Sequence, residues 1–411
     1  MQKQNKTLQA VILCAGKSTR TYPLTLTRPK TLLSIANSPI IRYFLDNLSG
    51  LVDEVIIVVN YMKEMIIKEV GDSYKGMKIV FVEQKQMLGT ADAVIAAESY
   101  IKDKFLLMYG DDLYSQEDFK QILKHEYALL AKKVEDPRLF GIIQTKNNKA
   151  LGIIEKPAAN IDIGNLANVG VFMLDKSIFA YKNKIKKSSR DEFELTDMLS
   201  LMMKDKSFAI VEAQQWIPIT YAWSLLEANE ILLNKLTKSE IKGNVEKNAA
   251  IKGIVILGKN SIIKNGAYLE GTIIIGENCT IGPNCYIRGP TAIGNNCKVG
   301  NAVEIKASIL FDNVHVGHLS YVGDSVIGEK VNFGAGSIIA NLRHDNKTVQ
   351  SFINGKKIDS GRRKLGAIIG DNVHLSIKTA IYPGRKIWPD IDTAPCEIIK
   401  IDKMKQWKGE D

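Results

Sequence analysis

The sequence of 411 residues contains no apolar run close to the roughly 18 residues that a membrane-spanning helix needs. It has only five cysteines and no Cys-x-x-Cys pair of the kind that binds zinc. The net charge of +10 comes from scattered lysines, without a dense cationic block interleaved with aromatic residues. These absences argue against a membrane protein, a zinc module and a nucleic-acid-binding protein. Solvated lysines account for the charge, and binding of polyphosphates is compatible with it.

The composition is that of a soluble globular protein, with 45% apolar and 24% charged residues. The length predicts two or three domains, each with its own core. Residues 1–7 are polar and the apolar stretch after them is only as long as a strand, so we expect no signal peptide. The expected location is the cytoplasm.

A loop near the N-terminus, residues 13–30, combines small residues with fixed positive charge, and we call it the signature loop. It follows a strand predicted over residues 10–14, and it carries Gly16, Arg20 and Lys30. The backbone N–H groups of a small-residue turn, together with two cations, favour binding of phosphate.

Two widespread phosphate motifs do not explain this loop. The Walker A motif requires a glycine five residues before Gly16, where the sequence has Val11. The dinucleotide-binding fingerprint requires glycines at the positions of Ser18 and Thr21. The sequence therefore predicts a phosphate-binding loop of a different kind.

The first half of the chain alternates strand-like and helix-like segments. Apolar strands that alternate with helices predict a mostly parallel sheet covered on both faces, in an α/β domain that ends near residue 225. Ligands bind at the carboxyl ends of such strands, where both the signature loop and residues 110–112 are expected. The predicted strands are residues 10–14, 54–59, 78–83 and 105–109, and the predicted helices are residues 39–48, 62–69 and 90–100.

After a helix-like segment at residues 224–236 the periodicity changes. An apolar residue recurs at every sixth position from Ile251 to Phe311, and the pattern resumes, with breaks, up to Ile387. Fixed self-similarity marks a repeat architecture, and this pattern resembles the hexapeptide repeat of left-handed parallel β-helices, in which three hexads make one triangular coil. The sequence thus predicts an α/β domain with its linker helix over residues 1–236 and a β-helix over residues 237–411.

The repeat also accounts for three of the five cysteines. Cys279, Cys285 and Cys297 each follow an apolar repeat position by four residues, where the other residues are small or β-branched. We predict that these thiols fill the interior of the coil and bind no metal.

The signature loop resembles the signature of sugar-1-phosphate nucleotidylyltransferases, Leu-x-Ala-Gly-x-Gly-Thr-Arg followed by Pro-Lys, with Ser18 in place of one glycine. The resemblance extends to about residue 230. It implies a Rossmann-like domain that binds a nucleoside triphosphate, UTP or dTTP, and a sugar 1-phosphate. The further matching segments are Gln84 with residues 88–91, the Gly-Asp pair ending at Asp111, residues 155–157 and residues 168–170.

The resemblance assigns a role to each matching residue. A sugar-phosphate oxygen attacks the α-phosphorus and expels pyrophosphate, so catalysis consists chiefly of positioning and charge neutralisation. Two plainer interpretations stay open: Asp111 as the N-cap of a helix, and Lys156 as a surface cation. The implied roles are catalysis for Arg20 and Lys30, nucleotide binding for Leu13, Ala15, Gly16, Gln84, Gly89 and Thr90, sugar-phosphate binding for Gly141, Glu155, Lys156 and Asn168, and Mg²⁺ binding for Asp111.

The chain departs from this family at one position. The family usually has a second metal-binding Asp or Asn in a Trp-x-Asp-x-Gly segment, and here Trp216 is followed at that position by Pro218. Proline has no side-chain atom that can bind a metal ion. Either Asp111, substrate phosphates and water suffice to hold Mg²⁺, which commonly keeps several waters, or this activity is weakened or lost.

His318 lies where the hexad register breaks, so that its side chain can leave the coil. Its surroundings resemble the acetyltransferase domain of the bifunctional family that makes UDP-N-acetylglucosamine. The resemblance implies that His318 takes a proton from the amine of glucosamine 1-phosphate, which then attacks the thioester of acetyl-CoA. A structural histidine and, around residues 361–364, an exposed loop are the plainer accounts. The implied sugar-phosphate contacts are Arg288, Lys306, Tyr321 and Asn332, and the implied acetyl-CoA contacts are Asn341, Lys347, Arg362 and Arg363.

Three functions are open at this point. The favoured one is a bifunctional enzyme that acetylates glucosamine 1-phosphate and then transfers a uridylyl group to the product. The second is a glucose-1-phosphate uridylyl- or thymidylyltransferase whose β-helix only assembles subunits. The third is a non-catalytic regulatory subunit, since the same domain pairing occurs in a translation initiation factor; Pro218 favours this view, and His318 with its matching neighbours argues against it. The family also implies a homotrimer, with neither nucleic acid nor membrane as a partner.

Overall fold

The computed structural model describes residues 8–147, 149–157 and 164–405, so the polar segment 1–7 lies outside the described residues. The chain divides into two compact units. One comprises residues Met1–Lys17 and Ile40–Pro218, and the other comprises Ser18–Pro39 and Ile219–Asp411. Most of the signature loop thus belongs to the same unit as the repeats. No helix in the described ranges is long and apolar enough to cross a membrane.

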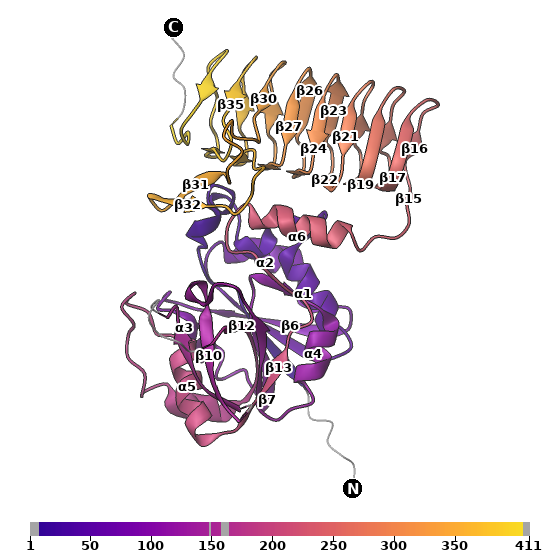
Figure 1. The fold of residues 1–411 in the computed structure, drawn as a ribbon. Coiled ribbons are helices and arrows are strands. Elements are labelled where there is room, and N and C mark those ends of the chain that lie inside the picture. Colours follow the sequence, from indigo (N-terminus) through magenta and orange to yellow (C-terminus); the bar gives the residue numbers. More distant parts are fainter. Residues whose placement is uncertain (1–7, 148, 158–163, 406–411) are drawn as a thin grey trace. The chain divides into compact units, whose positions relative to one another are not determined.

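The first unit is built around a ten-stranded sheet with helices on both faces (Figure 1). Its centre is parallel, because β1 pairs with β4 and β7 in the same direction and β4 pairs likewise with β6. Strands of this kind are apolar throughout, since both faces are covered. The strands, in sheet order, are β10 (Gly141–Lys146), β11 (Lys149–Glu155), β13 (Phe208–Glu212), β9 (Ala128–Lys133), β12 (Leu166–Asp175), β7 (Lys104–Tyr109), β1 (Gln9–Leu13), β4 (Glu54–Val59), β6 (Met77–Glu83) and β5 (Ser73–Tyr74).

The predicted parallel sheet is confirmed. β4 has the predicted bounds, and β1, β6 and β7 differ from prediction by one residue. Leu13 at the end of β1 pairs with Tyr109 at the end of β7. The two carboxyl ends therefore lie side by side, as the order of strands and helices predicted.

Among the residues that the structure describes, five α-helices accompany this sheet. The helix predicted over residues 90–100 is shorter than expected, because Ala97, Glu98 and Tyr100 donate backbone hydrogen bonds three residues back and tighten the chain into turns. Ser115 and Asp118 form a reciprocal capping box that starts the fourth helix. The helices are α1 (Ile40–Leu48), α2 (Lys63–Val70), α3 (Thr90–Ala96), α4 (Gln116–Ile122) and α5 (Leu195–Asp205).

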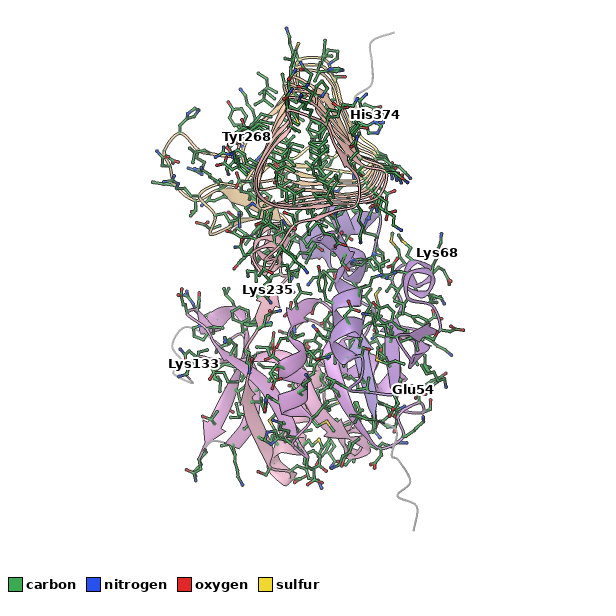
Figure 2. All side chains as sticks on the ribbon, turned by 90° about the vertical axis from the view of Figure 1, so that its right-hand side faces the viewer. Glu54, Lys68, Lys133, Lys235, Tyr268 and His374 are labelled. Atoms are coloured by element: carbon green, nitrogen blue, oxygen red, sulfur yellow. The ribbon has the colours of Figure 1, made fainter. Side chains whose placement is uncertain are left out.

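In most of the second unit the chain winds into parallel strands that pair with strands 16 to 18 residues further along. The strands form three rows, which trace a triangle when viewed along the coil (Figure 2). α6 (Ser224–Leu233) packs against β19 and β22. The first row contains β17 (Ala250–Leu257), β19 (Tyr268–Ile275), β21 (Tyr286–Arg288), β24 (Glu304–Lys306), β27 (Tyr321–Gly323), β30 (Ile338–Ile339), β35 (Ala380–Ile381) and β37 (Ile398–Ile399).

The ends of β17 and β19 also belong to the second row. The third row forms a sheet of its own. The second row further contains β15 (Glu240–Ile241), β22 (Thr291–Ile293), β25 (Ile309–Leu310), β28 (Val326–Ile327), β33 (Ile368–Ile369) and β36 (Lys386–Ile387), and the third contains β16 (Asn244–Val245), β18 (Ile262–Ile263), β20 (Thr280–Ile281), β23 (Lys298–Asn301), β26 (His315–His318), β29 (Asn332–Phe333) and β34 (His374–Leu375).

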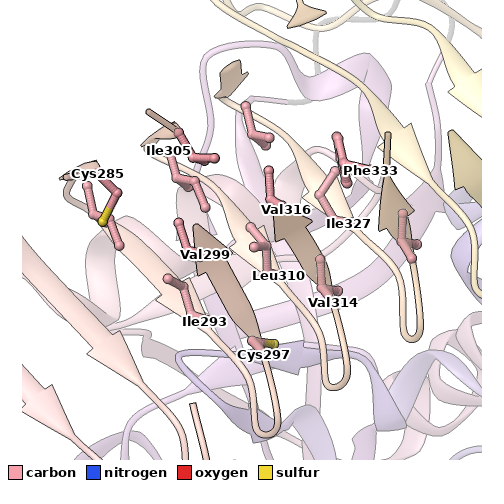
Figure 3. Packing of buried hydrophobic residues seen from close by; sticks show 14 of the residues in the cluster. Cys285, Ile293, Cys297, Val299, Ile305, Leu310, Val314, Val316, Ile327 and Phe333 are labelled. Carbon is pink, nitrogen blue, oxygen red and sulfur yellow. The ribbon is translucent and has the colours of Figure 1, made fainter. Parts of the chain in front are cut away.

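The interior of the coil is a continuous apolar cluster (Figure 3). The predicted sixth-position residues from Leu257 to Phe311 are all buried, and Ile251 at the open end is half-buried. Cys279, Cys285 and Cys297 are buried in the same cluster, and burial raises the pKa of the Cys285 thiol to about 12. The prediction that these three thiols fill the core is confirmed.

One corner of the coil is built from residues with a left-handed backbone. Asparagine adopts this conformation more readily than most residues, because its short side chain can bond locally. The amide of Asn260 donates to that of Asn278 one coil further on, at 3.2 Å. The residues at this corner with positive φ are Asn260, Asn278, Asn296, Asn313, Lys330, Asn372 and Asp390.

The coil is interrupted once. Val326 pairs with Ile368, an offset of 42 residues, and the pairs on the other two rows show the same offset. The additional residues leave the coil as a loop with a two-stranded hairpin, β31 (Gln350–Ile353) and β32 (Lys356–Asp359). The parallel register resumes afterwards without a shift.

Candidate active sites

The start of the signature loop is held tightly against the sheet. Cys14 donates a backbone hydrogen bond to Val58 at 2.8 Å, and Gly110 donates one to Leu13 at 3.0 Å. A Cβ atom on Gly110 would lie 2.5 Å from the Cys14 sulfur and 2.8 Å from the Leu13 carbonyl oxygen. Glycine is required here because the loop and the end of β7 approach so closely. Beyond this contact Ala15 is buried and Gly16 is exposed.

Asp111 lies in the turn that follows β7, and its side chain is half-buried. Burial raises the pKa of the Tyr109 hydroxyl, and the carboxylates of Glu155 and Asp111 raise it further. The carboxylates of Asp111, predicted to bind Mg²⁺, and of Glu155, predicted to bind the sugar phosphate, therefore both lie near Tyr109. The alternative that Asp111 caps a helix is wrong, because β8 (Asp112–Tyr114) follows it directly and the N-cap of α4 is Ser115.

The predicted base-binding segment forms a braced turn ahead of α3. Gln84 is buried, and its side-chain amide donates to the Gly89 carbonyl at 3.0 Å and to Asp92 at 2.8 Å. Gly89 has a φ of +115°, and a Cβ atom there would lie 2.5 Å from the Phe193 carbonyl oxygen. Thr90 accepts the Leu195 N–H at 2.9 Å. The turn is thus fixed from both sides.

The predicted sugar-phosphate residues lie on neighbouring strands. Gly141 stands opposite Glu155 in the pair β10–β11, and a Cβ atom on Gly141 would lie 2.8 Å from a Glu155 carboxylate oxygen. Lys156 is exposed, with a φ of 46°. Asn168, on β12, accepts the Gly170 N–H at 3.0 Å. A glycine at 141 therefore leaves room for the Glu155 side chain.

Pro218 lies across from Asp112 in the antiparallel pair formed by β8 and β14 (Trp216–Pro218). The Trp216 indole donates to the Asp112 carboxylate at 2.8 Å. Among the residues that the structure describes, no three His, Cys, Asp or Glu side chains gather into a metal site. Mg²⁺ is commonly bound by one or two carboxylates together with substrate phosphates and water. The single half-buried carboxylate of Asp111 fits an ion that is held only partly by the protein.

The two predicted catalytic cations belong to the second unit. Arg20 is exposed, in the short helical turn η1 (Thr19–Thr21). Lys30 is buried at the start of η3 (Lys30–Leu32), with 6% of its surface exposed. The two residues thus differ in their freedom to move.

On the coil, three of the predicted acetyltransferase residues gather around a buried carboxylate. Asp324 accepts from the Lys306 ammonium at 2.8 Å and from the Asn341 amide at 2.6 Å. The same amide donates to the Tyr321 hydroxyl at 3.0 Å. A Cβ atom on Gly323 would lie 2.5 Å from that hydroxyl oxygen, so this cluster requires glycine beside it.

Arg288 extends the same row by one coil. Its position pairs with Lys306, and its guanidinium donates to Glu304 at 3.2 Å and lies 5.5 Å from the centre of the Tyr286 ring. The Glu304 contact raises the pKa of Arg288. Two cations therefore stand in neighbouring coils, an arrangement suited to a phosphate.

His318 and Asn332 lie on the third row. His318 ends β26 and is exposed, and its carbonyl accepts the Ser320 hydroxyl at 2.7 Å. Asn332 is exposed on β29, which follows β26 in the row. The predicted acetyltransferase residues therefore lie on two rows of the coil. His318 and Asn332 are on the third row, and Arg288, Lys306 and Tyr321 are on the first. His318 lies at the corner before Tyr321.

The predicted acetyl-CoA cations lie in the loop that interrupts the coil. Lys347 and Arg363 are exposed, whereas the Arg362 guanidinium donates to the Lys364 carbonyl at 3.3 Å. Their loop returns to the coil where Leu365 donates to the Asn341 carbonyl at 2.9 Å. The cations and Asn341 are therefore parts of one connected segment.

The sequence analysis assigned no role to two carboxylates at these sites, Asp112 and Asp324. Asp112 directly follows the Gly-Asp pair at residues 110–111, and Asp324 is the acidic member of the pair at residues 323–324. Gly-Asp at the end of a strand was the available signal in each case. Its strength is low by itself, since this pair also occurs in ordinary turns.

The fold and these residues define a sugar-nucleotide transferase joined to a repeat domain. Residues 9–235 match the family model described as nucleotidyl transferase, and residues 269–390 match the one described as the GMPPB C-terminal domain. A solved structure, UDP-glucose pyrophosphorylase complexed with UDP-glucose, covers 56% of this chain and all of its own, with a TM-score of 0.51 and 22% identity. At that identity the likeness concerns the fold alone.

Two relatives extend the match over nearly the whole chain. Bifunctional protein GlmU of Methanocaldococcus jannaschii is 40% identical over 383 residues, 92% of either chain. The bifunctional sugar-1-phosphate nucleotidylyltransferase/acetyltransferase of Sulfurisphaera tokodaii is 41% identical over 404 residues, 96% of this chain and 98% of its own. The chain belongs to this family of bifunctional nucleotidylyltransferase/acetyltransferase enzymes.

Proposed function

We propose that this enzyme makes UDP-N-acetylglucosamine in two steps. The first transfers an acetyl group from acetyl-CoA to glucosamine 1-phosphate, and the second transfers a uridylyl group from UTP to N-acetylglucosamine 1-phosphate and releases pyrophosphate. The observation that carries this proposal is the gathering of Lys306, Tyr321 and Asn341 around Asp324 on the coil. A repeat domain that only assembles subunits has no need of such a polar cluster.

In uridylyl transfer the protein brings two polyanions together. The backbone around Gly16 with Arg20 and Lys30 faces the triphosphate, and Lys156 faces the sugar phosphate. A sugar-phosphate oxygen forms the new bond to the α-phosphorus as the bond to pyrophosphate breaks, so no side-chain nucleophile is needed. Asp111 would hold Mg²⁺, which neutralises phosphate charge when bound. Glu155 and Asn168 would orient the sugar, and Gln84, Gly89 and Thr90 the base.

In acetyl transfer His318 acts as the general base. Its imidazole takes a proton from the glucosamine ammonium, and the freed amine attacks the thioester carbon. The carbon–sulfur bond then breaks, and coenzyme A leaves as its thiol after gaining a proton. Arg288 and Lys306 hold the sugar phosphate, while Tyr321 and Asn332 contact the sugar. Asn341, Lys347, Arg362 and Arg363 bind the acetyl-CoA.

The proposal includes the architecture in which these steps occur. The coil is a left-handed β-helix of hexapeptide repeats, and the catalytic domains are residues 1–236 and 237–411. Three chains assemble, and acetyl-CoA is held between the coils of neighbouring chains. The enzyme acts in the cytoplasm, without nucleic acid or membrane as a partner.

A coupled assay of both half-reactions tests this function. Purified enzyme with acetyl-CoA and glucosamine 1-phosphate is expected to release coenzyme A, and with UTP and N-acetylglucosamine 1-phosphate to release pyrophosphate. His318→Ala is expected to abolish only the first, and Asp111→Asn only the second. Absence of coenzyme A release, with glucose 1-phosphate as the preferred second substrate, would favour a uridylyl- or thymidylyltransferase with a structural coil. Absence of both products would favour a regulatory subunit.

A further inference from the structure

The signature loop is attached to the coil through Arg28. The guanidinium donates to Asp371 at 2.5 Å and to Glu329 at 3.0 Å, and the neighbouring Thr27 hydroxyl donates to the same Asp371 oxygen at 2.7 Å. Asp371 follows β33, and Glu329 follows β28 one coil earlier. The other oxygen of Asp371 accepts the Glu329 N–H at 2.7 Å, so the two acceptors are themselves joined.

This ion pair is buried. Only 14% of the Arg28 side chain and 7% of the Asp371 side chain are exposed. The guanidinium carbon also lies 5.2 Å from the centre of the Phe311 ring. Burial alone would lower the pKa of Arg28, but the Asp371 and Glu329 carboxylates raise it. Breaking a buried pair by removing one partner is costly, since the other charge is left without compensation.

The rest of the segment from Ser18 to Pro39 is held in the same way. The Asn37 amide donates to the Ile293 carbonyl at 2.6 Å, and the Asn354 amide of the hairpin donates to Thr19 at 3.3 Å. Inside the loop, the hydroxyls of Thr21 and Thr25 both donate to the Ser18 carbonyl, at 2.7 and 3.0 Å. Figure 1 shows this indigo segment beside β31 and β32. The segment is therefore held to the coil by hydrogen bonds along its length.

Arg28 is separated from Lys30 only by Pro29, whose ring fixes the backbone torsion. Anchoring the guanidinium restrains the backbone of Arg28. Through the rigid Pro29, it also restrains the position of η3 and of Lys30. A displacement of about 1 Å at a reacting group can lower a rate about a hundredfold. The contacts of Arg28 with Asp371 and Glu329 are thus close enough in the chain to Lys30 to control the position of its side chain.

We propose that Arg28 is a positioning residue for uridylyl transfer, and that the coil, through Asp371 and Glu329, holds the catalytic loop in its working position. The inference rests on the proposed function of the signature loop. It makes uridylyl transfer depend on residues of the coil that lie outside the acetyltransferase cluster.

The test uses full-length variants assayed for both reactions. Arg28→Met is expected to lower kcat for uridylyl transfer roughly 10- to 100-fold with little change in KM for UTP, while acetyl transfer stays within twofold. Arg28→Lys, which keeps the charge, is expected to recover part of the loss. Asp371→Asn in the Arg28→Met background is expected to add little, because both changes remove the same contact.

The matched control is Arg42→Met, since Arg42 on α1 forms an ion pair with Glu69 on α2 that is more exposed than that of Arg28, with 44% of the Arg42 side chain exposed. It is expected to leave both reactions unchanged. Should Arg28→Met unfold the chain, Glu329→Gln, which removes only the longer contact, is expected to lower uridylyl transfer two- to fivefold with acetyl transfer intact. Unchanged kcat in a folded Arg28→Met, or in Glu329→Gln, overturns the inference. A wild-type enzyme without uridylyl transfer contradicts the proposed function instead.

Discussion

Pro218 lies directly across from Asp112 in the strand pair β8–β14, and the neighbouring indole of Trp216 donates to the Asp112 carboxylate. The family resemblance predicts a second metal-binding carboxylate at position 218, and the proline there has no side-chain atom that can bind a metal. We therefore propose that Asp111, substrate phosphates and water hold Mg²⁺.

Pro218→Asp is expected to restore a second carboxylate and strengthen Mg²⁺ binding. The Mg²⁺ concentration for half-maximal uridylyl transfer should fall about three- to tenfold, as expected for an added charged ligand worth roughly 1 kcal/mol. A Mg²⁺ titration of pyrophosphate release measures this. Pro218→Ala, which removes the ring and adds no carboxylate, serves as the control. Equal Mg²⁺ dependence in all three proteins would contradict the expectation.

Gly110→Ala is expected to disrupt the first unit where the signature loop meets β7. The new Cβ atom would lie 2.5 Å from the Cys14 sulfur, so the loop must shift, at a cost of about 1 to 3 kcal/mol. We expect loss of uridylyl transfer with acetyl transfer retained. The contrasting variant is Gly16→Ala, which meets no atom within 4 Å. It should keep wild-type stability in a denaturant titration and lose affinity for UTP. Equal stability of Gly110→Ala and wild type would show that the contact is not tight.

Asp324→Ala is expected to impair acetyl transfer and the stability of the coil. It leaves the ammonium of Lys306, whose side chain is 16% exposed, without its carboxylate. Removing one member of a buried pair costs about 3 to 5 kcal/mol. Urea unfolding and coenzyme A release measure the two effects, and Asp324→Asn, which keeps the shape, should lose less stability. A variant as stable and as active as the wild type would contradict this role.

Lys386 is expected to make stability depend on alkaline pH. Its side chain is buried, burial lowers the pKa of the ammonium to about 8, and the groups that face it are Asp402, Arg385 and the Phe352 carbonyl. In the unfolded chain the pKa is about 10.4. Between these values the unfolded state holds more protons, so the free energy of unfolding rises with pH.

Comparison of wild type and Lys386→Met in denaturant at pH 7.5 and pH 10 measures this dependence. The wild type should gain about 1 to 3 kcal/mol relative to the variant over this interval. Lys330→Met, at an exposed lysine, is the control and should follow the wild type. A wild type and Lys386→Met with parallel pH profiles would show that the ammonium is not destabilised by burial.

Local pattern was sufficient to predict much of the fold. The strand over residues 54–59 and the inward residues of the coil were predicted correctly, because burial on both faces leaves an unbroken apolar run or a fixed period. The end of α3 was not, because tight turns at Ala97 depend on hydrogen bonds that residue types do not specify.

The parts that escaped prediction involve residues far apart in the sequence. Nothing near Arg28 indicates that its partner is Asp371, and the Gly-Asp pair at residues 323–324 does not indicate that Asp324 joins Lys306 to Asn341. Such contacts are fixed only once the coil has brought distant residues into neighbouring turns. A single sequence carries no period or motif for the partners.

The interruption between Val326 and Ile368 does not disturb the pairing of the coil, because the strands on either side remain in register on all three rows. The hairpin is nevertheless fastened to the coil, since Lys386 donates to the Phe352 carbonyl and Arg385 donates to the Gln350 carbonyl at 2.8 Å. The buried Ser351 hydroxyl also donates to the Gly384 carbonyl at 2.9 Å. The inserted segment is thus part of the scaffold, and changes in its paired strands carry over to the coil.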